Sequence, residues 1–193
     1  MARLFFAVGV SREVMSALES LCSRLQKRAP ADCLRFIQAD KAHYTLRFLG
    51  EEPPDRQAAA VRAGHAAAKG VGPFEVTLRA LGVFPDERRP HTLWIGAGGG
   101  AAELVQLASR LEGQLVREGF SPDGRAFVPH LTLARVKRRL PSEAMRALLT
   151  GPDETIGAMH VASFVLMESK PTNKGTRYIP LETFPLEMPC TPS

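Results

Sequence analysis

The stretch KAHYTLRFLG, residues 41–50, has the composition of a half-buried strand that contains one histidine. A second stretch, FVPHLTLARV at residues 127–136, repeats its central pattern of His, one apolar or aromatic residue, Thr and Leu. The two copies lie a little under half the chain length apart, and each half of the chain shows a strand, a helix and further strands in similar order. This repetition predicts a duplicated α+β architecture related by a pseudo-two-fold axis.

The strand geometry of the repeated pattern brings its polar residues together. Side chains at positions i and i+2 of a strand share a face, about 6.5–7 Å apart along the chain. His43 therefore shares a face with Thr45, and His130 shares a face with Thr132. The apolar residues between them can anchor each strand in its own core, which leaves both His–Thr pairs free to face a shared cleft.

Two imidazoles and two hydroxyls in one cleft suit the chemistry of a phosphodiester. A neutral imidazole accepts a proton and an imidazolium donates one, both near neutral pH. Threonine hydroxyls can donate hydrogen bonds to nonbridging phosphate oxygens. A lone histidine on a half-buried strand is more often structural, but a duplicated His-x-Thr-Leu pattern favours catalysis.

Hydrophobic periodicity predicts alternating strands and helices. We expect strands at 3–10, 34–37, 43–50, 73–84, 92–98, 130–136, 161–168 and 176–184, and helices at 12–28, 53–69, 101–118 and 142–149. Ser11 is a suitable N-cap for the first helix. The Gly-rich stretch GAGGGAAEL, residues 96–104, lacks the Lys-Ser/Thr of a P-loop, so it is interpreted as a turn before a helix.

The amino-acid composition is that of an ordinary globular protein. The 193 residues are 45% hydrophobic and 23% charged, and no apolar run is long enough to cross a membrane. The three cysteines, Cys22, Cys33 and Cys190, match no metal or redox spacing, so we expect reduced thiols in a cytoplasmic protein. The net charge of +5 favours polyanionic partners, but on charge alone a solvated basic surface is the preferred explanation.

The remaining histidines are interpreted as structural or surface residues. His91 is followed directly by Thr92, which an extended strand places on the opposite face. His65 lies in an Ala-rich helix and is expected to be exposed, and His160 opens a late strand.

The residues around both motifs carry a family resemblance. The motifs HYTL (43–46) and HLTL (130–133) fit the paired H-x-[ST]-x pattern of the 2H phosphoesterases. The similarity extends to RLFFAV (3–8), LRFLGEE (46–52), GVFPDERRPHTLWIG (82–96), FVPHLTLARV (127–136) and ESKPTNKGTRYIPLETFPL (168–186). The chain thus resembles the RNA 2',3'-cyclic phosphodiesterases, also called 2'-5' RNA ligases or LigT-like proteins.

This resemblance implies an α+β, bilobal fold in which two antiparallel sheets with pseudo-two-fold symmetry line a central cleft and the helices lie outside. Residues 1–193 would form a single bilobal domain with one His-x-Thr-x motif in each lobe. The implied activity is hydrolysis of RNA 2',3'-cyclic phosphate ends to 2'-phosphomonoesters, without metal or other cofactor. The implied partner is RNA with a 2',3'-cyclic phosphate end, tRNA fragments included, and we expect a monomer that contacts no membrane.

The resemblance also implies roles for individual residues. His43 would protonate the leaving 3'-oxygen, and His130 would accept the proton of the attacking water. Thr45 and Thr132 would bind the phosphate oxygens. Arg135 is a further candidate for a phosphate or RNA contact, although in an ideal strand it faces away from His130, so that it needs a bulge or a reach from the side.

Several alternatives stay open at the level of sequence. The same residues could join a cyclic phosphate end to a 5'-hydroxyl through a 2'-5' bond, and a non-catalytic module could use the cleft only to bind RNA or nucleotides. Among the aromatic residues, Phe48 is a candidate for base stacking. Tyr44 and Trp94 are also candidates but fit the core better. Arg47 shares the strand parity of His43, so its contact with RNA is an open question.

Overall fold

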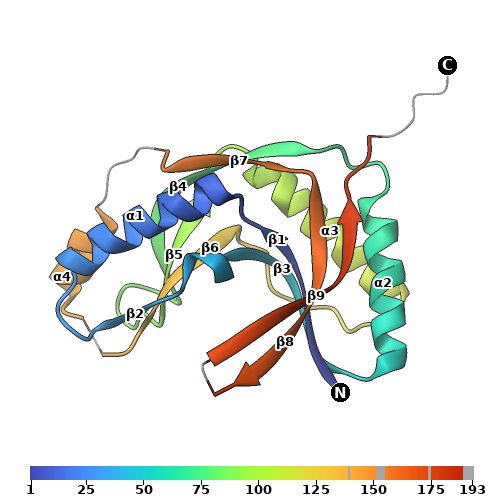
Figure 1. Ribbon diagram of the computed structural model, residues 1–193, viewed down its shortest axis with the longest axis horizontal. Helices are drawn as coiled ribbons and strands as arrows, with labels where there is room; N and C mark the ends of the chain where they lie inside the picture. Colours follow the sequence, from blue (N-terminus) through green and yellow to red (C-terminus); the bar gives the residue numbers. More distant parts are fainter. Residues whose placement is uncertain (139, 151–154, 174, 189–193) are drawn as a thin grey trace.

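The computed structural model describes residues 1–138, 140–150, 155–173 and 175–188 (Figure 1). Its strands are β1 (Ala2–Gly9), β2 (Leu34–Phe36), β3 (His43–Glu52), β4 (Phe74–Phe84), β5 (Thr92–Ala97), β6 (His130–Val136), β7 (Gly157–Val161), β8 (Ser163–Thr172) and β9 (Gly175–Pro185). The helices are α1 (Arg12–Arg28), α2 (Pro54–Ala68), α3 (Ala101–Arg117) and α4 (Ser142–Leu149), and η1 (Ala39–Lys41) is a short 3-10 turn. The expected α+β class is confirmed.

The strands form one curved antiparallel sheet in the order β7-β4-β5-β6-β3-β1-β8-β9, with β2 paired to β6 (Figure 1). The two motif strands, β6 and β3, lie at the centre of this order and are joined through a single residue pair, Tyr44 and Leu131. Outward from this junction each half contains three further strands of the main path. The two sheets expected from the sequence are therefore the two halves of one sheet, connected at its narrowest point.

Two of the helices pack against the half of the sheet opposite to the strand that they follow. Helix α1 follows β1 but packs against β7 in the other half, whereas α3 follows β5 and packs against β3 (Figure 1). The buried stripe of α1 consists of four apolar residues at helical spacing, Val14, Leu18, Leu21 and Leu25. The Ser11 hydroxyl accepts a hydrogen bond from the Val14 amide, as the expected N-cap would. Helices α1 and α3 cover the sheet and hold its halves together.

The predicted strand at 161–168 is wrong in its extent. The structure has two strands there: β7 pairs with β4 at one edge of the sheet, and β8 pairs with β1 in the other half. Only Ala162 separates them, so the chain changes from one half to the other within a single residue. Period-two alternation continues across such a crossing, so the pattern alone does not show it.

A β-bulge interrupts β3 at the last residue of the first motif. Thr45 lies opposite Ala7 of β1 and Arg47 lies opposite Phe6, which leaves Leu46 as an extra residue on β3. A bulge inverts the alternation of the side chains that follow it. Arg47 therefore does not share the face of the first motif, although an ideal strand would place it there.

The second motif strand carries a bulge at the matching position. Thr132 lies opposite Trp94 of β5 and Ala134 lies opposite Leu93, which leaves Leu133 as the extra residue on β6. Leu133 and Ala134 are both buried, as expected where two successive side chains point to the same side. The fifth residue after each motif histidine thus returns to the face of that histidine.

Arg47 ties β3 to the segment that precedes β6. Its Nε lies 2.6 Å from a Glu112 carboxylate oxygen and its Nη1 lies 3.4 Å from Asp123, while Nη2 donates to the Ser121 carbonyl at 2.6 Å. The Arg47 side chain is only 12% exposed. Arg47 is therefore a structural residue and not an RNA contact, because its guanidinium is already bound to these acceptors.

The remaining sequence expectations concern thiols and membrane segments. Cys22 and Cys33 are free thiols, whereas Cys190 lies outside the described residues. Among the residues that the structure describes, no helix has both the length and the hydropathy needed to cross a membrane.

The Arg47 ion pairs give a testable prediction about stability. Replacing Arg47 by Met should lower the free energy of unfolding by about 2 kcal/mol, because Glu112 and Asp123 lose a shielded cationic partner. The matched control is Arg62→Met, which breaks an ion pair to Glu118 whose arginine is 61% exposed; solvent screens this pair, so its loss should cost clearly less than the loss of Arg47. Urea unfolding of both variants tests this, and equal losses would contradict it.

Candidate active site

Both motifs line one cavity of about 330 Å³. It brings together all five residues predicted for the site: His43, Thr45, His130, Thr132 and Arg135. The cavity is completed by residues that the sequence analysis did not assign to it, among them Arg3, Phe5, Lys41, Ser169, Thr176 and Tyr178. Two of the added side chains, Ser169 and Tyr178, lie directly opposite each other on the β8–β9 hairpin.

The two histidines are held in the same way. The Nδ1 atom of His43 lies 2.9 Å from the Lys41 carbonyl oxygen, and Nδ1 of His130 lies 2.7 Å from the Val128 carbonyl oxygen. In each case the acceptor is the carbonyl two residues earlier. A carbonyl oxygen can only accept, so Nδ1 carries the proton and donates it. The Nε2 atom of each ring then remains available to accept or donate a proton in the cavity.

Aromatic rings surround His43. The Phe5 ring lies 5.0 Å from the imidazole between centroids, and the Tyr178 ring meets it edge-on at 5.1 Å. Burial among these rings lowers the pKa of His43 below its usual value. The hydrogen bond to the Lys41 carbonyl raises this pKa, and positive charge on His130 lowers it.

His130 has a corresponding environment of two aromatic rings and a backbone carbonyl. The Phe84 ring meets its imidazole edge-on at 4.8 Å, and the Trp94 ring lies at 6.1 Å. Burial is the largest cause that lowers the pKa of His130; the Val128 carbonyl raises it and the positive charge of Arg135 lowers it. The charge of Arg135 therefore favours the neutral imidazole at this position.

Arg135 reaches the cavity because of the bulge at Leu133. Its Nη1 donates to the Thr92 hydroxyl at 2.6 Å, and Thr92 is 5% exposed. His91, which was expected to be a structural or surface residue, is exposed and lies outside the cavity. Thr92 was not predicted as a site residue, because its place opposite Arg135 depends on the β5–β6 pairing.

Of the three aromatic residues considered for base stacking, only Phe48 lines the cavity, among the residues that the structure describes. Tyr44 is fully buried on the far side of β3, and burial raises the pKa of its hydroxyl. Trp94 packs behind His130, and its ring occupies the space over Gly82, where a Cβ would lie 2.2 Å from the indole. Phe48 is 39% exposed at the cavity, stacked 5.8 Å from Phe5.

The Gly-rich turn before α3 is not a phosphate cradle. The amide of Gly98 donates to the Thr77 carbonyl at 2.8 Å, and the amide of Gly99 donates to the Thr77 hydroxyl at 2.7 Å. Gly100 has a φ of +79°, and a Cβ there would lie 2.1 Å from the Glu75 carbonyl oxygen. The glycines therefore let the turn pack closely against β4, as the interpretation of a turn predicted.

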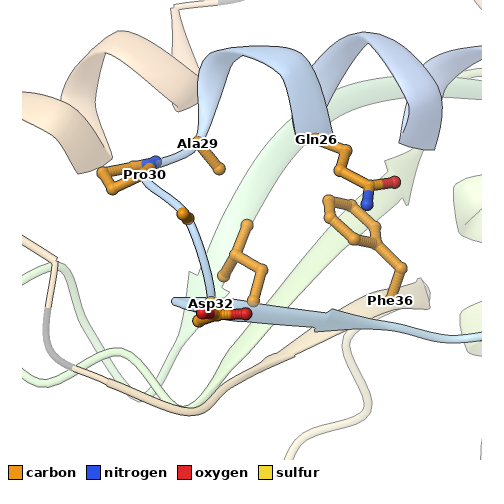
Figure 2. Close-up of a pocket in the computed structure, with 7 residues that line it drawn as sticks. Gln26, Ala29, Pro30, Asp32 and Phe36 are labelled. Atoms are coloured by element: carbon orange, nitrogen blue, oxygen red, sulfur yellow. The ribbon is translucent and has the colours of Figure 1, made fainter.

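A second cavity, of about 380 Å³, lies between the end of α1 and β2 (Figure 2). Gln26, Asp32 and Phe36 are among its lining residues, and Phe36 points from β2 toward the helix. It contains neither motif. Within the described part of the chain, no three His, Cys, Asp or Glu side chains gather closely enough to hold a metal ion.

Known proteins match both the sequence and the fold. A family model described as the 2'-5' RNA ligase superfamily matches residues 12–172. The chain is 38% identical over 149 residues to an RNA 2',3'-cyclic phosphodiesterase of Aeropyrum pernix, covering 75% of this chain and 82% of the relative.

Two crystal structures show the same architecture. A protein of Thermus thermophilus superimposes with a TM-score of 0.79 at 30% identity, covering 96% of this chain and 98% of that one. Escherichia coli LigT complexed with 3'-AMP gives a TM-score of 0.76 at 28% identity and the same coverage. With its two His-x-Thr-x strands facing one cavity, the chain belongs to the 2'-5' RNA ligase superfamily of 2H phosphoesterases.

Proposed function

We propose that this protein hydrolyses RNA 2',3'-cyclic phosphate ends to 2'-phosphomonoesters by metal-independent acid–base catalysis. The observation that carries the proposal is the matched pair of imidazoles in one cavity. Each has its Nδ1 atom bound to a backbone carbonyl, which leaves Nε2 for the reaction. The names of the similar proteins agree with it, since the Aeropyrum relative is an RNA 2',3'-cyclic phosphodiesterase.

The proposed reaction is an in-line displacement at phosphorus. Water attacks the phosphorus opposite the 3'-oxygen, and its proton passes to Nε2 of His130. The bond from phosphorus to the 3'-oxygen breaks, and Nε2–H of His43 protonates that oxygen. The phosphate remains on the 2'-oxygen. His130 has gained one proton from the water, and His43 has given one proton to the 3'-oxygen.

The negative charge that develops on the phosphate needs fixed donors. We assign the Thr45 and Thr132 hydroxyls to the nonbridging oxygens, because both line the cavity beside their histidines. Arg135 adds a permanent positive charge on the same side, held in place by Thr92. Donors that are already oriented need little reorganisation as the transition state forms.

The division of roles between the histidines follows the family resemblance and agrees with the local charges. Arg135 favours the neutral form of His130, which is the form that accepts a proton. No cation other than His130 is among the causes that lower the pKa of His43. Once His130 is neutral, His43 can hold the proton that it must donate.

We further propose that the chain acts as one bilobal domain and as a monomer, with tRNA fragments among its RNA substrates. A catalytic group from each half of the sheet supports a single working unit. Among the large exposed apolar residues of the described part of the chain, Val105 and Val116 share helix α3 and the others lie on separate segments, which supports a monomer. The same site can also join a cyclic phosphate end to a 5'-hydroxyl through a 2'-5' bond. The 5'-hydroxyl then attacks phosphorus in place of water, its proton passes to His130, and His43 protonates the leaving 3'-oxygen.

One prediction concerns the two histidines. Replacing either His43 or His130 by Ala should lower kcat on a short RNA that ends in a 2',3'-cyclic phosphate by about 10²–10⁴-fold, since each loss removes one positioned proton carrier. Wild-type activity should survive EDTA, and the product should be the 2'-phosphate. Chromatography of the products checks both points.

The control for this experiment is His65→Ala, which removes an exposed histidine on α2. Its activity should equal that of the wild type. Full activity in both motif variants would refute the mechanism. Tight, salt-sensitive RNA binding without any turnover by the wild type would instead identify a binding module.

Another prediction concerns Arg135. In Arg135→Gln the pKa of His130 should rise, because the positive charge that opposes its protonation is gone. His130 must be neutral to accept a proton, so the limb of the kcat/KM profile that rises with pH should move to higher pH. NMR titration of the His130 ring measures the pKa directly. The control is Arg177→Gln, on an exposed position of β9, and an unchanged or lowered pKa in Arg135→Gln would contradict the prediction.

A further inference from the structure

Strand β2 presents its two faces to different surroundings. Leu34 and Phe36 line the cavity beneath α1, and Phe36 points toward that helix (Figure 2). Ile37 lines the catalytic cavity instead. Because side chains alternate along a strand, Arg35 lies on the same side as Ile37, about 6.5–7 Å further from the cavity. It is an exposed residue directly opposite Arg135 on β6.

A third cation continues this side of the sheet. Lys137 follows Arg135 at a spacing of two, and its amide donates to the Cys33 carbonyl at 2.8 Å, so the β2–β6 pairing extends that far. Lys137 is exposed and, by strand alternation, shares the face of Arg135. We call Arg35, Arg135 and Lys137 the basic row; it leads from the catalytic cavity outward along β2 and β6.

The charges of the basic row are not neutralised by the protein. Within the described part of the chain, no carboxylate forms an ion pair with Arg35 or Lys137. Like charges directly opposite each other on neighbouring strands destabilise a sheet. A row of cations that begins at the catalytic cavity is therefore a site for a polyanion whose end lies in that cavity.

Nearby carboxylates are directed elsewhere. Asp32 lines the other cavity, on the α1 side of β2 (Figure 2). Asp86 accepts hydrogen bonds from the backbone amides of Arg88 and Arg89. Within the residues that the structure describes, Asp32 and Asp86 therefore form no ion pair with the basic row, in keeping with its unpaired charges.

We infer that Arg35 and Lys137 bind the phosphodiester backbone of the RNA upstream of its cyclic phosphate. This inference rests on the proposed function. The terminal phosphate occupies the cavity beside Arg135, and the preceding phosphates lie along β2 and β6. The basic row thereby makes the enzyme selective for RNA chains over nucleoside cyclic phosphates, which have no upstream phosphate to bind.

The test compares two substrates in the Arg35→Gln/Lys137→Gln variant. On an oligoribonucleotide that ends in a 2',3'-cyclic phosphate, kcat/KM should fall about tenfold, mainly through KM, as expected for lost charge-assisted contacts at an exposed site. The slope of log kcat/KM against log salt concentration should become shallower by about 0.7 for each lost phosphate contact. On a nucleoside 2',3'-cyclic phosphate, kcat/KM should stay unchanged.

The control variant is Lys69→Gln/Arg117→Gln, which removes two exposed positive charges at the C-terminal ends of α2 and α3. It should leave activity on both substrates unchanged, so that net charge alone is not the cause. Equal losses of the basic-row variant on both substrates, or no loss on the oligoribonucleotide, would overturn the inference. Unfolding midpoints of both variants exclude a loss of folded protein.

Binding provides an independent readout. Fluorescence anisotropy with a single-stranded oligoribonucleotide that ends in a 3'-phosphate needs no turnover. The basic-row variant should bind it about tenfold more weakly than the wild type does. If the wild type hydrolyses neither substrate, the proposed function fails, whereas the binding comparison still decides whether the basic row holds RNA; equal affinities would refute it.

Discussion

Burial of Tyr44 opposite Leu131 determines where the two motif histidines lie relative to each other. Both residues are fully buried, and the two halves of the sheet meet at their pairing. Because strand side chains alternate, each buried residue places the histidine before it on the opposite face. The two motif strands could slide past each other only by exposing these side chains, so the hydrophobic effect sets the distance between the imidazoles.

The surroundings of each motif histidine have opposing effects on its pKa. Aromatic rings exclude water and lower the pKa of both imidazoles, while a carbonyl hydrogen bond at each Nδ1 raises it. That same bond fixes the tautomer and the ring orientation, which a proton carrier requires. Arg135 then distinguishes two otherwise matched sites, because its charge acts on His130 alone.

The paired bulges convert a symmetrical scaffold into an asymmetrical site. At the fifth position after the motif histidine, one half presents Phe48 and the other presents Arg135. An aromatic ring and a guanidinium suit different parts of a nucleotide, the base and the phosphate. The position before Phe48 is used for stability instead, since the Arg47 ion pairs hold the segment that leads to His130.

The sequence by itself determined the class of fold, most element boundaries and the four motif residues of the site. These features depend on local periodicity and on a pattern repeated within one chain, both of which are visible without coordinates. Register, bulges and sheet order were decided by the tertiary structure. A bulge is one unpaired residue, and the amino-acid sequence does not show where it lies. Strand pairing is therefore needed to see that Arg135 faces the cavity and contacts Thr92, whereas Arg47 faces away from it. The same holds for Tyr178 and Phe84, which reach the histidines from strands distant in sequence, because long-range packing leaves no trace in local alternation.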